Sequence, residues 1–243
     1  MTMEALQNLA HRIDLPSGLL ESHKVLFTEA FTHRSAITSN TVNEHNERLE
    51  FLGDAVLELV TTEFLFHKFP DPEGVLTNYR SALVKRENLA TVARKLELGE
   101  ILRLSRGEDR SGGRGKDYLL ANALEALIGA LYLAGGMTVA EEFIRRFVLV
   151  ELDEILEEGA HIDAKSAFQE FTQGEFGITP TYEVLEAVGK DHEKEFKMGA
   201  YLDETLVGTG SGKSKKEAQT DAALQALTAK ETWSPNFEKK ESN

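Results

Sequence analysis

The chain has 243 residues, of which 41% are hydrophobic and 28% charged, and this balance excludes a chain that is disordered throughout. It contains no cysteine, which excludes disulfides, a thiolate nucleophile and cysteine-bound zinc and makes the reducing cytoplasm the default compartment. The formal net charge of −14 argues against unspecific affinity for nucleic acid, so any surface that binds it must be a local basic patch.

Helical periodicity dominates residues 1–156, where apolar residues recur three and four positions apart. Helices are predicted over 24–37, 47–69, 75–98, 117–134 and 138–156, with breaks at 40–46, 69–74 and 107–116. The apolar run from Tyr118 to Gly136 is long enough to suggest a membrane span, but it contains Asn122 and Glu125, and a carboxylate at the centre of a bilayer costs about 2.5 to 3.5 kcal/mol. We therefore expect an all-α domain with a buried helix here, and no membrane contact.

The pattern changes after a short polar stretch, 157–162, which we interpret as a linker. Beyond it, a helix is predicted over 164–173, strands over 182–187, 195–203 and 205–209, and a helix over 214–230. The second domain, 163–230, is thus a small α+β unit with the order α-β-β-β-α. The polar tail, 231–243, shows no periodicity and is predicted to be disordered.

Three acidic residues follow one face of the predicted helix 47–69. Glu47, Glu50 and Asp54 stand at i, i+3 and i+7, and no lysine or arginine interrupts this stripe. Carboxylates gathered without a cation suit a hard divalent ion such as Mg²⁺, which takes oxygen ligands. On spacing alone, an ordinary acidic surface is the alternative.

A second segment supports the metal interpretation. Asn122 and Glu125 are the only polar side chains in 120–129 and stand at i and i+3. Because burial without partners is costly for both groups, they need a shared partner. Packing this helix against the acidic one would bring Glu50, Asp54, Asn122 and Glu125 around one point, as in a metal site.

Two motifs then resemble a known family. Residues 46–57, NERLEFLGDAVL, resemble the signature of ribonuclease III, and residues 120–133, LANALEALIGALYL, resemble its second metal-binding helix. The segment Thr32-His33-Arg34-Ser35 and the second domain, which resembles a double-stranded-RNA-binding domain, extend the resemblance over nearly the whole chain. The chain is therefore similar to a bacterial ribonuclease III.

The resemblance implies a Mg²⁺-dependent endonuclease, with Mn²⁺ as a possible substitute, that is a homodimer through its catalytic domain. Such enzymes hydrolyse double-stranded RNA, including rRNA and mRNA precursors, and leave 5′-phosphate and 3′-hydroxyl ends with short 3′ overhangs. Of the four implied metal ligands, Asp54 and Glu125 carry the activity. The full ligand set is Glu50, Asp54, Asn122 and Glu125. Glu47 and Glu73 match acidic family positions and would act as supporting acids, although Glu73 is also a favourable residue for the first turn of a helix.

One position departs from the family pattern, because Asn122 stands where the family usually has aspartate. Asparagine keeps one carbonyl oxygen as a ligand but removes a negative charge, so we expect lowered Mg²⁺ affinity with cleavage retained. Two alternatives stay open. The first is a double-stranded-RNA-binding protein with a weakened or inactive nuclease site, and the second is a metal-dependent phosphohydrolase of small nucleotides, which would leave the second domain unexplained.

In the second domain, the resemblance implies contacts to 2′-hydroxyls and phosphates across successive minor grooves. The candidate RNA-binding residues are Gln169, Glu170 and Gln173 on the first helix, His192 between the first two strands, and Lys213, Lys215 and Lys216 at the start of the last helix. The alternative for Lys215 and Lys216 is a solvated surface. Binding is expected to be sensitive to salt and largely independent of sequence.

Three further features receive plainer interpretations. The stretch 208–214, GTGSGKS, lacks the first glycine of a phosphate-binding loop, since Val207 holds that position, and no nucleotide cofactor is predicted. The stretch 107–116 is either a basic loop that approaches RNA or a plain mobile loop. His33 is interpreted as a histidine that packs against helices rather than a metal ligand.

Overall fold

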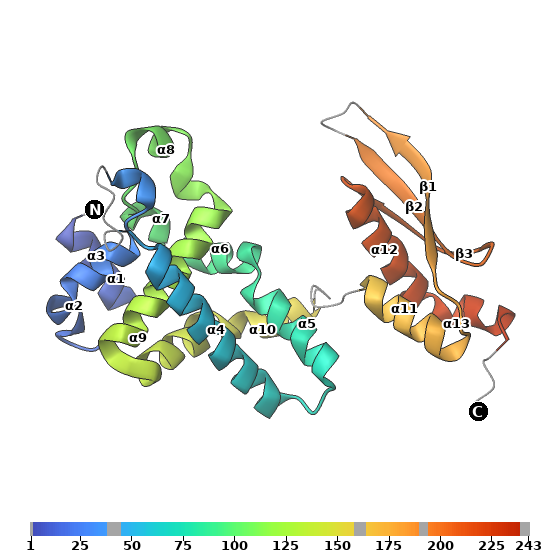
Figure 1. Cartoon of the computed structure of the whole chain (residues 1–243), viewed down its shortest axis with the longest axis horizontal. Coiled ribbons are helices and arrows are strands. Elements are labelled where there is room, and N and C mark those ends of the chain that lie inside the picture. The colour runs from blue at the N-terminus through green and yellow to red at the C-terminus, as the bar shows by residue number, and fades with distance from the viewer. Residues whose placement is uncertain (1, 38–44, 158–163, 190–193, 239–243) are drawn as a thin grey trace. The chain divides into compact units, whose positions relative to one another are not determined.

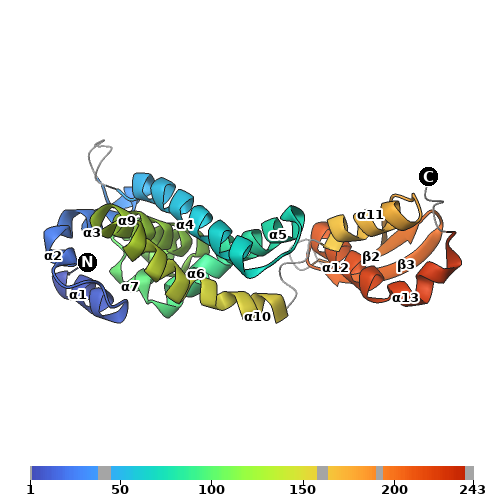
Figure 2. The same cartoon turned by 90° about the horizontal axis from the view of Figure 1, so that it is seen from below.

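The computed structural model describes residues 2–37, 45–157, 164–189 and 194–238. The chain divides into two compact units, Met1–His161 and Ile162–Asn243. Figures 1 and 2 show that the first unit is built from helices alone, whereas the second is a sheet with helices on one face. The predicted linker, 157–162, lies outside the described residues except for Glu157, which ends a helix.

The first unit is all-helical, as the sequence predicts. Its α-helices are α1 (Met3–Arg12), α2 (Leu19–Ser22), α3 (Lys24–Ala30), α4 (Glu47–Lys68), α5 (Glu73–Val84), α6 (Arg86–Lys95), α7 (Leu98–Ile101), α8 (Arg106–Arg110), α9 (Asp117–Phe147) and α10 (Leu152–Glu157). Short 3-10 turns are η1 (Arg34–Ala36), η2 (Gly113–Gly115) and η3 (Leu149–Glu151). Leucine, valine, alanine and phenylalanine side chains from nearly all of these helices form one continuous core.

Helix α9 runs through the middle of this unit, and α4 lies across it (Figure 1). From Leu119 to Leu131 every residue of α9 is buried except Asn122 and Glu125. By length and composition α9 could cross a membrane, but half of its most apolar stretch is buried inside the unit. The prediction of a buried helix is confirmed. The helix kinks at Gly136, whose φ of 76° is costly for other residues.

Three predicted helices are broken: 138–156 is divided among α9, η3 and α10, and two others end at interactions that periodicity does not reveal. The segment 75–98 divides at Lys85, which is extended with φ −60° and ψ 147°. The side-chain amide of Asn88 donates to the carbonyl oxygen of Leu83 at 2.6 Å and so satisfies an acceptor at the end of α5. The segment 24–37 ends its α-helix at Ala30, because the chain there turns to pair Thr32 with Arg103.

The second unit has the predicted order of elements. These are α11 (Ala164–Glu175), β1 (Thr181–Val188), β2 (Glu195–Leu202), β3 (Thr205–Gly212) and α12 (Lys215–Thr228), followed by α13 (Lys230–Trp233) and the 3-10 turn η4 (Ser234–Asn236). The strands form an antiparallel sheet in the order β1-β2-β3, with Val184 opposite Met198 and Met198 opposite Gly210. Helices α11 and α12 cover one face of this sheet (Figure 2).

Glycines at alternate positions of β3 allow α12 to pack directly against the strand. A Cβ atom at Gly210 would stand 2.1 Å from the backbone nitrogen of Ala222, and one at Gly208 would stand 2.5 Å from the carbonyl oxygen of Ala222. Such distances leave no room for a side chain. The glycine-rich stretch therefore serves close helix-to-sheet packing, which explains its resemblance to a phosphate-binding loop.

The prediction that the tail is disordered from residue 231 is wrong for residues 231–238. Trp233 is only 6% exposed, and its Nε1 donates to the carbonyl oxygen of Ala226 at 2.7 Å. Its ring packs edge-on against Phe168 and Phe171 of α11, and Phe237 packs against it in turn. Two aromatic residues in a polar segment are enough to anchor it, because each buries a large apolar area.

Candidate metal centre and RNA-binding surface

The candidate site lies where α4 crosses α9 at backbone contact. A Cβ atom at Gly53 would stand 1.8 Å from the carbonyl oxygen of Glu125, and one at Gly129 would stand 2.3 Å from the carbonyl oxygen of Leu49. Two glycines facing each other thus let the helices approach more closely than side chains would permit. Because Asp54 follows Gly53 directly, the crossing brings Asp54 beside Glu125.

The four predicted ligands meet around this crossing. Glu50, Asn122 and Glu125 are partly buried, whereas Asp54 is exposed. Asn122 hydrogen-bonds the Glu50 carboxylate, and the charges of Glu50 and Asp54 both act on Glu125. The structure therefore gathers residues from two helices that lie about seventy positions apart in the sequence into one half-buried polar cluster.

Burial and mutual repulsion make two of these carboxyl groups hard to ionise. Burial, followed by the negative charges of Asp54 and Glu50, raises the pKa of Glu125 to about 7, and the positive charge of Arg86 opposes this rise. Burial is also the main cause that raises the pKa of Glu50, with further contributions from Glu47 and Asp54. A cation placed among these groups would relieve both effects.

The chemistry of this cluster fits a hard divalent ion. It offers carboxylate and amide oxygens, which Mg²⁺ and Mn²⁺ prefer. Within the described ranges, no three His, Asp or Glu side chains stand close enough together to enclose an ion as they are. Like charges without a cation between them repel one another, and a Mg²⁺ site keeps several water ligands and so needs few direct protein contacts.

Of the two supporting acids, Glu47 borders this cluster, since its charge acts on Glu50, whereas Glu73 lies apart from it. Glu47 pairs with Arg34 at 3.3 Å and faces His45 at 3.8 Å. Glu73 opens α5 and accepts a hydrogen bond from the hydroxyl of Thr77 at 3.3 Å. Lys68, the last residue of α4, lies fourteen residues beyond Asp54 along the helix, or about 21 Å. Within one copy of the chain, Glu73 is therefore not brought to the other acids.

Glu125 makes cation binding depend on pH, and the direction follows from its raised pKa. Below about pH 7 the cation-free protein holds a proton on Glu125, which an incoming ion must displace. We expect the affinity for Mn²⁺, measured calorimetrically without RNA, to fall by up to about tenfold per pH unit below pH 7. The same raised pKa makes the cation-free fold more stable below pH 7 than above it.

Glu125→Gln is the control for this pH dependence, since it cannot bind or release the proton. In this variant the dependence between pH 6 and pH 8 should become much shallower. An unchanged slope would show that another group takes up the proton.

The predicted RNA-binding residues of the second unit lie at the surface where the structure describes them. Gln169, Glu170 and Gln173 are exposed on α11, and Gln173 donates to the hydroxyl of Thr179 at 2.9 Å. Lys213, Lys215 and Lys216 are exposed around the start of α12. His192 lies outside the described residues. The side chain of Ser214 caps α12 by accepting from the backbone nitrogen of Glu217 at 3.1 Å.

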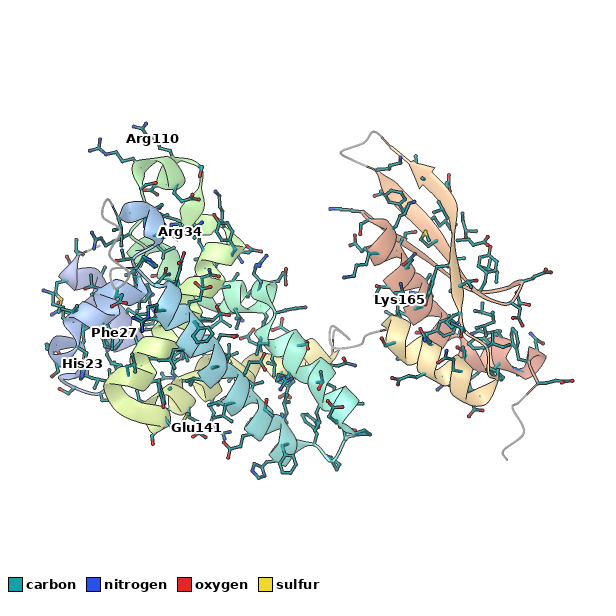
Figure 3. All side chains as sticks on the ribbon, viewed as in Figure 1. His23, Phe27, Arg34, Arg110, Glu141 and Lys165 are labelled. Carbon is teal, nitrogen blue, oxygen red and sulfur yellow. The ribbon has the colours of Figure 1, made fainter. Side chains whose placement is uncertain are left out.

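The stretch 107–116 is an ordered lobe rather than a plain loop. Arg114 pairs with Asp109 at 2.8 Å and donates to the carbonyl oxygen of Gly99 at 2.8 Å, while Lys116 pairs with Glu108 at 2.7 Å. Two of its basic residues are thus engaged inside the domain. Arg110, the third basic residue of this stretch, points away from the domain (Figure 3).

His33 lies as interpreted, within the packing of the first unit. Its Nδ1 accepts from the backbone nitrogen of Ser35 at 3.3 Å and lies 2.9 Å from the Ser35 hydroxyl. Burial is the main cause that lowers the pKa of His33, which favours the neutral ring.

The sequence pattern alone does not single out the two glycines of the crossing, which position the candidate site. Gly53 and Gly129 place Asp54 against Glu125, although neither carries a side chain. A signal was available, since glycine in the interior of a predicted helix is unfavourable by about 1 kcal/mol and calls for a packing reason.

Comparison with known proteins gives the family of each unit. Residues 23–152 match a family model described as Ribonuclease-III-like, and residues 164–229 match the double-stranded RNA binding motif. Ribonuclease 3 of Moorella thermoacetica is 44% identical over 92% of this chain and 94% of that protein. Ribonuclease 3 of Nitratiruptor sp. is 45% identical over 84% of this chain and 89% of that protein. The chain is also similar to the crystal structure of the ribonuclease III nuclease domain from Campylobacter jejuni. The match covers 56% of this chain and 95% of the Campylobacter chain, at 41% identity and a TM-score of 0.49.

These matches define the class of protein as an endonuclease, a hydrolase, joined to a module that binds double-stranded RNA. The match to curated relatives extends over almost their full length. The chain belongs to the ribonuclease III family and is an endoribonuclease that acts on double-stranded RNA.

Proposed function

We propose that Mg²⁺, or Mn²⁺ in its place, binds at the crossing of α4 and α9, held by Glu50, Asp54, Asn122 and Glu125. One observation supports the proposal. Between Leu119 and Leu131 of α9, only Asn122 and Glu125 are not fully buried, and both of them interact with acids of α4. Bound there, the ion would supply an activated water as nucleophile and stabilise charge on the departing 3′ oxygen.

Asp54 and Glu125 are the residues we assign to catalysis. They lie where the two helices come closest, and the raised pKa of Glu125, about 7, supports a position where a cation or a proton would relieve repulsion. Hydrolysis at this site yields a 5′-phosphate and a 3′-hydroxyl, and paired sites acting on both strands leave short 3′ overhangs. Precursors of rRNA and mRNA in the cytoplasm are the proposed substrates, to be tested by sequencing RNA ends in cells that lack the protein.

The second unit supplies affinity for the duplex. Lys213, Lys215 and Lys216 are proposed to contact phosphates, while Gln169, Glu170, Gln173 and His192 are proposed to reach the minor grooves. The exposure of the described members supports these roles.

Replacing Asn122 by aspartate tests the ion site. The variant Asn122→Asp restores a fourth negative charge, so we expect the Mg²⁺ concentration for half-maximal cleavage of a long duplex to fall by roughly fivefold to tenfold. The metal-free variant should also be less stable, because the new carboxylate faces Glu50 in place of an amide that hydrogen-bonds it. An unchanged Mg²⁺ requirement would contradict the proposed role of Asn122 as a ligand.

The same experiment decides between the enzyme and a second candidate function. A protein whose nuclease site is disabled by Asn122 would bind duplex RNA but never cut it, while Asn122→Asp would cut. Cleavage by the unaltered protein at high Mg²⁺ excludes this binding-only function.

A homodimer through the nuclease unit is proposed from an exposed apolar stripe on α4. Phe51 is 80% exposed, Leu59 56% and Phe66 69%, and with Ala55 they share one side of the helix. Beside Phe51 lies a pocket of about 870 Å³ whose walls include Leu26 and Leu133. A second copy of this chain fits both features, because a twofold interface places the same patch on each partner.

Removing one aromatic ring tests this interface. Because burying a phenylalanine contributes roughly 1.5 to 3 kcal/mol and a twofold interface contains it twice, Phe51→Ala should weaken dimerisation by about a hundredfold or more in sedimentation experiments. Val150→Ala is the matched control, since Val150 is 61% exposed but lies outside the stripe. Equal effects of both substitutions would exclude the proposed interface.

Dimerisation also gives Glu73 a place in the mechanism. If two α4 helices pair antiparallel along the stripe, the end of α4 in one copy, where Glu73 lies, meets the beginning of α4 in the other, where Glu50 lies. We propose that Glu73 supports the site of the partner copy. A mixed dimer of Glu73→Gln and Glu125→Gln chains should then retain one intact site.

A further inference from the structure

Most cations in the nuclease unit are engaged by acids of the same chain. Arg80 pairs with Glu58 at 3.0 Å and Lys95 with Glu151 at 2.7 Å, and an ion pair also joins Arg94 to Asp117. The chain has 41 acidic and 27 basic residues, so acidic partners outnumber the cations. A cation left without one next to acidic residues therefore calls for an explanation.

Arg86 is such a cation. It opens α6, is exposed, and makes neither an ion pair nor a side-chain hydrogen bond within the part of the chain that the structure describes. Helix α6 packs along α9 (Figure 1), and the charge of Arg86 acts on Glu125 across this contact. Arg86 is therefore close enough for its charge to act on Glu125, yet it is exposed and forms no ion pair with that carboxylate in the described part of the chain.

The position of Arg86 is unfavourable for the cation site itself. A fixed positive charge near the ligands repels Mg²⁺ and lowers its affinity. The benefit must therefore arise when another anion is present. In a nuclease this anion is the substrate, whose phosphate groups approach the same carboxylates, and a guanidinium group binds a phosphate through two parallel hydrogen bonds.

We infer that Arg86 is a substrate-binding residue that contacts an RNA phosphate next to the bond that is cut. Arg86 holds the RNA backbone at the acidic cluster while the second unit binds the duplex elsewhere. The inference rests on the proposed placement of the active site at the crossing of α4 and α9. It adds a phosphate contact from the nuclease unit to those of the RNA-binding unit.

Duplex binding across a salt series tests this inference. The binding constant of a duplex is measured with Mg²⁺ in the Glu125→Gln background, which prevents cleavage, with and without Arg86→Gln. Loss of one phosphate contact should weaken binding by about fivefold at moderate salt and reduce the slope of log K against log salt by close to one. Arg86→Lys, which keeps the charge, should retain the slope.

Arg145→Gln is the matched control, because it removes the same charge from an exposed arginine that pairs with Glu141 at 2.7 Å. It should leave both the binding constant and the slope unchanged. If Arg86→Gln behaves like Arg145→Gln, Arg86 does not contact RNA and the inference is overturned. Failure of the proposed function would be detected by a different result, namely that the unaltered protein does not cleave duplex RNA at any Mg²⁺ concentration.

Discussion

Glu125→Gln is expected to reduce cleavage of double-stranded RNA by at least about a thousandfold while duplex affinity stays within about twofold. The substitution keeps the size of the side chain but removes the charge at the centre of the cluster. Binding survives because the RNA-binding unit, which carries the exposed lysines at the start of α12, is untouched. Single-turnover cleavage and filter binding measure the two quantities on one preparation.

The stability of the same variant gives an independent readout. In the cation-free protein at pH 8, ionised Glu125 is partly buried beside the charges of Asp54 and Glu50, so Glu125→Gln should raise the free energy of unfolding. Glu142→Gln is the control, since Glu142 lies on the same helix but is exposed and should alter neither cleavage nor stability. Retained cleavage in Glu125→Gln would remove this residue from the catalytic site.

Gly53→Ala is expected to destabilise the nuclease unit by about 3 kcal/mol and to abolish cleavage. The added methyl group would stand 1.8 Å from the carbonyl oxygen of Glu125, which is backbone and cannot rotate away. The two helices must therefore move apart, and Asp54 moves away from Glu125 with them. Chemical denaturation measures the stability, and cleavage at high Mg²⁺ measures the activity.

Gly74→Ala is the matched control for this prediction. Gly74 also lies in a helix, in the first turn of α5, but a Cβ atom there would meet nothing within 4 Å. This substitution should be neutral or stabilise slightly, because alanine favours helix more than glycine does. If both substitutions had the same effect, contact between α4 and α9 at Gly53 would not determine the geometry of the site.

Much of the fold could be predicted because helix and strand periodicities report burial on one face. The pattern predicts α4, α12 and the three strands to within a few residues, whereas α9 continues to Phe147 where the pattern predicts two helices, 117–134 and 138–156. It does not predict the break at Lys85, because the cause is a hydrogen bond from Asn88 to Leu83 that no local composition reveals. Nor does it predict the order in residues 231–238, which depends on Trp233 reaching a cluster of aromatic residues distant in sequence.

The residues of the candidate site could be predicted from the sequence, but their arrangement could not. Glu50, Asp54, Asn122 and Glu125 could be selected because polar groups in an apolar helix need partners. Their convergence depends on Gly53 and Gly129, whose effect is visible only once both helices are in place. The role of Glu73 could not be assigned from one copy of the chain, since it lies at the far end of α4.

Trp233 is an intrinsic fluorescent probe of one unit of this protein. The chain contains one tryptophan, and it is packed among phenylalanine rings in the second unit, while the nuclease unit has none. Selectively excited fluorescence therefore follows the unfolding of the RNA-binding unit alone, whereas far-ultraviolet circular dichroism is dominated by the helices of the nuclease unit. The stabilities of the two units can thus be separated in the intact chain without cutting it.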